Sequence, residues 1–116
     1  MIEELITKIF CTRNCAHQQH WITDSYAEHS ALGDFYTDVI DLLDNFVEVH
    51  QGNFGKIDSI DFDCECKPIL KHLESDIQWI EKNYKSLSGS VTALQNILDE
   101  IVALYLKTIY KLRFLK

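Results

Sequence analysis

The sequence has few residues that interrupt helices. It contains one proline and four glycines in 116 residues. Domains built only from β-strands need many tight turns, and turns use glycine and proline heavily, so this scarcity argues against a β sandwich or barrel. Apolar residues make up 47% of the chain and charged residues 25%, the balance of a folded globular protein. We therefore expect one helical domain over residues 1–116, since a chain of this length builds a single core.

Two further features are scarce: long apolar runs and positive charge. No segment reaches the roughly 18 uncharged apolar residues of a membrane span. The first residues, Met1 to Leu5, are acidic and do not resemble a signal peptide, so we expect a cytoplasmic protein without membrane attachment. Eighteen acidic residues against eleven lysines and arginines give a formal net charge of −7. A field of that sign repels phosphate backbones, and we expect no binding to duplex DNA.

The four cysteines are expected to be reduced thiols. Cys11 and Cys15 stand one helical turn apart, and Cys64 and Cys66 form a C-x-C pair before His72. Disulfides are rare in the cytoplasm. The C-x-C spacing also differs from the C-x₂-C spacing of common structural zinc sites. We therefore predict free structural thiols, with a zinc site as the alternative.

The spacing of apolar residues predicts four amphipathic helices. The first series, Ile2, Leu5, Ile6 and Ile9, has the three- and four-residue spacing of a helix face. Ser25 is a candidate N-cap for the second helix. The predicted helices cover about residues 2–21, 26–50, 68–86 and 91–114.

The breaks between these helices indicate how they pack. Gly52 is the expected end of the second helix, and residues 52–66 are expected to form a loop, with or without a short helical turn, because their apolar periodicity is broken. Long helices with short connections between the first two and the last two predict an all-α, antiparallel four-helix bundle with a longer second connection. The last helix is apolar around much of its circumference, so it is expected either to be central in the bundle or to be buried against another subunit as well.

Several polar residues do not fit an ordinary bundle. The apolar stripe of the first helix ends in His17 and His20, and the second helix contains His29, Asp44 and Glu48. The two acids are four residues apart, so they share one face at the border of the apolar arc. They are either a solvated flank or metal ligands, because imidazole with carboxylates suits Fe(II), Mn(II) or Zn(II). No Glu-x-x-His occurs on the last two helices, so a di-iron core within one chain is not expected.

The order and spacing of these residues carry a specific resemblance. His20-Trp21, then His29, then Asp44-x₃-Glu48, with fifteen residues from His29 to Asp44, resembles the signature of the Dps family of mini-ferritins. The short chain also resembles members encoded by bacteriophages, which would place it in the host cytoplasm. The resemblance implies a ferritin-like bundle whose metal site lies between two subunits. His20 and His29 would come from one subunit and the acids from its neighbour. His17 is the alternative to His20, because it keeps the family's usual twelve-residue distance to His29.

The resemblance also implies an activity and an assembly. Iron would be bound as Fe(II), with a di-iron site as one form, and oxidised by peroxide or dioxygen, so the chain would be a ferroxidase that stores ferric iron. Zinc and manganese are the alternative metals. The implied assembly is a closed homo-oligomer, a dodecamer in the family's usual form. The alternative function is that of a non-catalytic helical bundle that binds a host protein or a small ligand.

Overall fold

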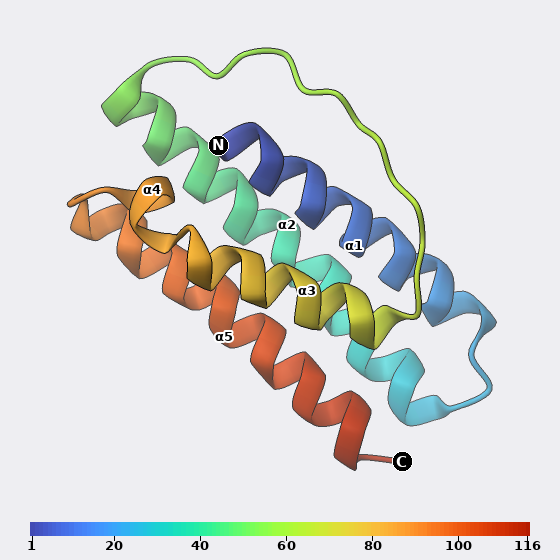
Figure 1. Cartoon of the computed structure of the whole chain (residues 1–116). Coiled ribbons are helices and arrows are strands. Elements are labelled where there is room, and N and C mark those ends of the chain that lie inside the picture. Colours follow the sequence, from blue (N-terminus) through green and yellow to red (C-terminus); the bar gives the residue numbers. More distant parts are fainter.

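The computed structural model describes residues 1–116 and contains five helices and no strand. The expected all-helical fold is confirmed, with one short helix more than predicted. The helices are α1 (Ile2–Ile22), α2 (Tyr26–Phe54), α3 (Ile69–Lys82), α4 (Tyr84–Ser88) and α5 (Thr92–Phe114). The four long helices lie side by side, and α4 forms a short turn of helix between α3 and α5 (Figure 1).

One apolar core runs through the bundle. It contains twenty buried residues drawn from all five helices. The predicted apolar arc of α2 supplies Leu32, Phe35, Val39, Leu43 and Phe46, each almost without solvent contact. Burial of each such side chain stabilises the fold by about 1.5–3 kcal/mol. The predicted stripes therefore face the interior of the bundle.

The link between α1 and α2 forms as the sequence predicts. The Ser25 side chain accepts a hydrogen bond from the Glu28 N–H at 3.2 Å, which caps the start of α2. Immediately beyond this link, His20 near the end of α1 contacts His29 near the start of α2. His17, His20 and His29 therefore lie at the same end of the bundle.

Two predicted helix ends are wrong. Helix α2 continues through Gly52 and ends at Gly55, whose φ of 96° no other residue adopts readily. A glycine is tolerated inside a helix, whereas a positive φ ends it. The third helix ends at Lys82 rather than near residue 86, because the backbone leaves helical values at Asn83 (φ −106°, ψ 12°), where the side chain also donates to the Trp79 carbonyl at 2.8 Å.

Residues 55–68 form the expected long connection, without a helical turn. Figure 1 shows this loop passing along the outside of α1 from the end of α2 to the start of α3. Thr7 donates to the Asp61 carbonyl at 3.3 Å, and the rings of Phe10 and Phe62 meet edge to face. The loop is therefore bound to α1 along much of its length. None of the five helices has both the length and the apolar character that crossing a membrane requires.

Candidate metal centre

His20 and His29 form a closely packed pair of imidazoles. Their ring centroids are 3.7 Å apart and nearly parallel. The His20 Nδ1 lies 2.6 Å from the His29 carbonyl oxygen, and the His29 Nδ1 lies 2.8 Å from the His20 carbonyl oxygen. A carbonyl only accepts, so both Nδ1 atoms bear the proton and donate it. An imidazole whose proton is on Nδ1 binds a metal through Nε2.

A glycine on α2 makes room for this pair. A Cβ atom at Gly33 would lie 3.1 Å from Cε1 of His20, closer than most real contacts. The absence of a side chain at Gly33 therefore lets the His20 ring lie against α2.

His17 lies in a different environment from His20. Its ring stacks on Tyr36, with centroids 3.9 Å apart, and contacts Trp21 at 4.2 Å. Desolvation by these rings, followed by the positive charge of Arg13, lowers the pKa of His17. The structure thus pairs His20 with His29 and places His17 in an aromatic stack.

Asp44 and Glu48 lie on the exposed side of α2, at the edge of an open cleft of about 410 Å³. The rest of the cleft is apolar and is lined by Ile6, Phe10, Leu43, Val47, Ile57, Ile60 and Phe62. Fifteen residues of helix separate His29 from Asp44, about 22 Å along the axis, so the histidines and acids of one chain cannot share an ion.

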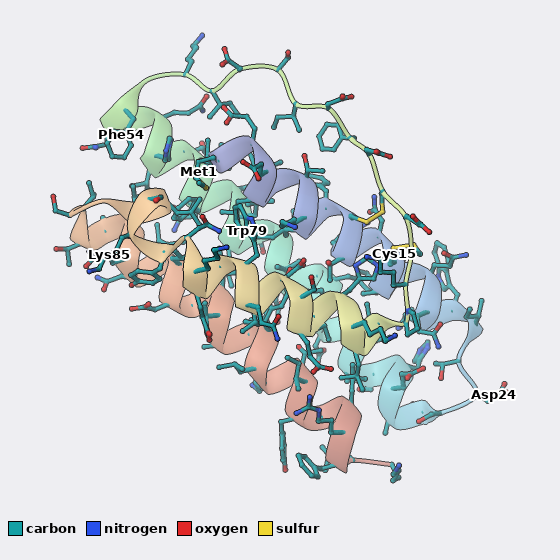
Figure 2. All side chains as sticks on the ribbon, in the orientation of Figure 1. Met1, Cys15, Asp24, Phe54, Trp79 and Lys85 are labelled. Carbon is teal, nitrogen blue, oxygen red and sulfur yellow. A yellow bond between two sulfur atoms is a disulfide. The ribbon has the colours of Figure 1, made fainter.

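The expectation of free thiols is wrong, because the four cysteines form two disulfides. Cys11 is bonded to Cys64 and Cys15 to Cys66, with Cα–Cα distances of 5.2 and 5.7 Å that suit a disulfide. Cys11 and Cys15 share one face of α1, because they are four residues apart in a helix. Cys64 and Cys66 are alternate residues of an extended loop, so their side chains point to the same side of it. Figure 2 shows the sulfur atoms between the loop and α1, near the labelled Cys15.

A buried polar network lies beside the disulfides. The Lys67 N–H donates to the His72 Nε2 at 2.8 Å, so the His72 proton is on Nδ1, which lies 3.4 Å from the Thr12 hydroxyl. Thr12 donates to the Asp76 carboxyl at 2.5 Å, and Tyr105 donates to the same oxygen at 2.7 Å. Burial raises the pKa of Asp76 to about 6, although both donors oppose the shift.

Sequence reasoning missed this network, although a signal was present. Asp76 stands inside the apolar stripe of α3, between Leu73 and Ile77, where a carboxyl group is buried unless the stripe is interrupted. The cysteine spacings were likewise visible, four residues apart on a helix and two apart in a loop. The position of Asp76 indicates a side chain that faces the core. The cysteine spacings indicate that the two cysteines of each segment point toward the same side.

Within one chain, the sulfur-rich region is where potential ligand atoms gather. Groups of three or more within 4.8 Å of one another are Cys11, Cys15 and His72, and Cys15, Cys64 and Cys66. The predicted residues His17, His20, His29, Asp44 and Glu48 form no such group in a single chain. An iron site made from them therefore requires a second chain.

Residues 20–112 match a family described as "Family of unknown function (DUF5856)". No curated protein and no solved structure matches the chain.

Proposed function

Because the chain belongs to the DUF5856 family, whose description gives no activity, we propose a function from its own residues. The chain binds iron between two copies of itself, as a Dps-like mini-ferritin. His20 and His29 of one copy and Asp44 and Glu48 of another supply the ligands. The five-helix chain then corresponds to an antiparallel ferritin-like bundle with a short added helix.

The observation that supports this proposal best is the reciprocal hydrogen bonding of the two histidines. Each Nδ1 donates to a main-chain carbonyl, so Nε2 is the ring nitrogen that is left to bind a metal. Such second hydrogen bonds orient metal-binding imidazoles in known sites. Two neutral imidazoles with two carboxylates form a ligand set that suits Fe(II).

The surfaces around the two half-sites are complementary. Trp21 and Tyr26 beside the histidines are 69% and 82% exposed, which is unusual for such large rings. The cleft beside Asp44 and Glu48 is apolar apart from these two acids. In the proposed dimer, Trp21 of one copy enters this cleft and brings the imidazoles to the carboxylates.

The proposed reaction uses Fe(II) as its substrate. Two Fe(II) ions each give one electron to hydrogen peroxide, which takes up two protons and leaves as two water molecules. Dioxygen is the alternative oxidant. The acids balance the charge of the iron, and the net charge of −7 per chain attracts cations to the shell. Ferric product accumulates in the hollow of a closed oligomer.

The alternative, a bundle that binds a host protein or small ligand, rests on the same cleft. Its apolar lining suits an amphipathic partner as well as it suits Trp21. In that case the acids at its edge orient the partner, and Fe(II) has no specific site.

Anaerobic Fe(II) titration followed by peroxide tests the iron proposal. We expect stoichiometric binding and oxidation by the parent chain, and binding at least about 100-fold weaker in the D44N/E48Q variant. The matched control is D38N/D41N, which removes the same charge from exposed positions of the same helix. Equal Fe(II) affinity in the D44N/E48Q variant and the parent would exclude the proposed site and favour the alternative.

A further inference from the structure

We propose that the four cysteines are a zinc site controlled by redox state, separate from the iron site. In the structure they form two disulfides. After reduction, the thiolates of Cys11, Cys15, Cys64 and Cys66 bind one Zn²⁺ ion.

The four sulfur atoms lie together in one small cluster. All three pairs among Cys15, Cys64 and Cys66 lie within 4.8 Å, as does the pair Cys11 and Cys15. Cys15 and Cys64 are not bonded to each other, and their sulfur atoms are 3.8 Å apart. A Zn–S distance of about 2.3 Å places sulfur ligands about 3.8 Å apart in a tetrahedral site. Opening the two disulfides lets the bonded pairs separate to the same spacing.

Contacts without sulfur hold the loop in place when the disulfides open. The loop and its neighbours on α1 and α3 share hydrogen bonds and an aromatic contact. The Asp58 N–H donates to the Glu3 carboxylate at 3.3 Å, and the Thr7 hydroxyl donates to the Asp61 carbonyl at 3.3 Å. The ring centroids of Phe10 and Phe62 are 5.5 Å apart, and the Lys67 N–H donates to the His72 Nε2 at 2.8 Å. The reduced chain therefore keeps both halves of the site together, which lowers the entropy cost of binding the metal.

The surroundings suit a zinc–thiolate centre. The adjoining pocket of about 260 Å³ is lined mostly by polar and charged side chains, so it admits a hydrated cation. Cys64 and Cys66 are exposed, so a reductant and the metal reach the sulfur atoms from solvent. Four thiolates in a tetrahedral arrangement favour zinc. Oxygen and nitrogen ligands, as in the proposed iron site, suit Fe(II).

The redox steps balance as follows. Each disulfide takes two electrons and two protons from one dithiol, which becomes a disulfide, so two dithiols produce four thiols. Zinc binding then releases up to four protons and moves no electrons. For the reverse, two molecules of hydrogen peroxide accept four electrons and four protons, give four water molecules, and leave two disulfides and free Zn²⁺.

The direct test uses the full chain in the D44N/E48Q background, which removes the acids of the proposed iron site. The chain is reduced with dithiothreitol, freed of it without air, and titrated with Zn²⁺ against a chromophoric chelator. We expect one Zn²⁺ per reduced chain by native mass spectrometry, and none at this affinity in the oxidised chain. Co²⁺ should give the absorption of a tetrahedral thiolate site. A folded, reduced chain that takes up no zinc would overturn the proposal, whatever the fate of the iron site.

Two paired variants separate the metal site from fold stability. C11S/C64S and C15S/C66S each remove one complete pair and leave the other pair able to close as a disulfide. Zinc binding by either reduced variant should be at least about 100-fold weaker than by the parent. Unchanged binding in either variant contradicts the four-cysteine site. If reduction unfolds the parent, zinc must restore its helical circular dichroism, and a failure to do so also overturns the proposal.

Discussion

Among single side chains, Asp76 has the clearest effect on stability. Its carboxyl group is buried, and its pKa is about 6 against an ordinary value of 3.8. Between these pH values the folded chain binds more protons than the unfolded chain. The contribution of Asp76 to stability is therefore greatest below about pH 4 and is lost as the pH rises through 6. The difference corresponds to about 3 kcal/mol, because one pKa unit is about 1.4 kcal/mol.

We accordingly predict that D76N raises stability above pH 6. Asparagine keeps an oxygen that accepts from Thr12 and Tyr105 without the buried charge. Urea unfolding of the oxidised chain should show a gain of up to about 3 kcal/mol at pH 7.5, and little change at pH 4. E81Q, on the exposed face of the same helix, should leave the pH dependence unchanged. A D76N variant with the parent's pH dependence would contradict the assignment.

The sequence predicted side-chain positions along one helix but not side-chain contacts between elements. His20 and His29 could be singled out from the stripe that they end, because a helix places them by spacing alone. Their reciprocal carbonyl contacts could not be predicted, since these depend on the α1–α2 link and on Gly33. The cysteine prediction failed because it was drawn from an expected compartment. The spacing of the cysteines places Cys11 and Cys15 on one helix face, but it does not show that Cys64 and Cys66 lie against that face.

Among the helices and loops, the end of α2 offers a matched pair of glycines. Gly55 has a φ of 96° and a ψ of 176°, a region that only glycine enters readily. Gly52 lies within the helix and has open space at its Cβ position. G55A should lower the free energy of unfolding by about 1–3 kcal/mol. G52A should raise it by about 0.5 kcal/mol, because alanine favours the helix.

Urea unfolding of both oxidised variants, followed by circular dichroism, distinguishes the two roles. Opposite signs for G52A and G55A would support the helix end at Gly55. Destabilisation by G52A as large as that by G55A would instead favour the end that the sequence alone suggested. Apolar periodicity locates the body of a helix well, but glycine identity does not tell which backbone angle the chain adopts. That is why the four long helices could be predicted and the ends of α2 and α3 could not.

At the scale of the whole molecule, the proposed association between copies rests on exposed apolar surface. Trp21, Ile22 and Tyr26 at the α1–α2 link are exposed, as are Tyr110 and Phe114 near the end of α5. The Lys111 Nζ of α5 lies 3.6 Å from the Asp34 Oδ2 of α2. This contact places the exposed apolar residues of the α1–α2 link and those of α5 at one end of the bundle. An apolar surface of this kind favours an interface. A symmetric dimer uses the same surface on both partners.

The last prediction tests whether the proposed iron ligands come from different chains. The H20Q/H29Q variant lacks the imidazoles, and D44N/E48Q lacks the carboxylates, so neither assembly should bind Fe(II) tightly by itself. In a mixed dimer, the histidines of one chain meet the acids of the other, which restores one of its two sites. Random mixing of equal amounts makes half of the dimers mixed, so about one quarter of the parent's sites should return. Unfolding and refolding the variants together, followed by anaerobic Fe(II) titration, measures this recovery. Refolding each variant alone is the control, and no recovery in a mixture shown by mass spectrometry to contain mixed dimers would contradict a shared site.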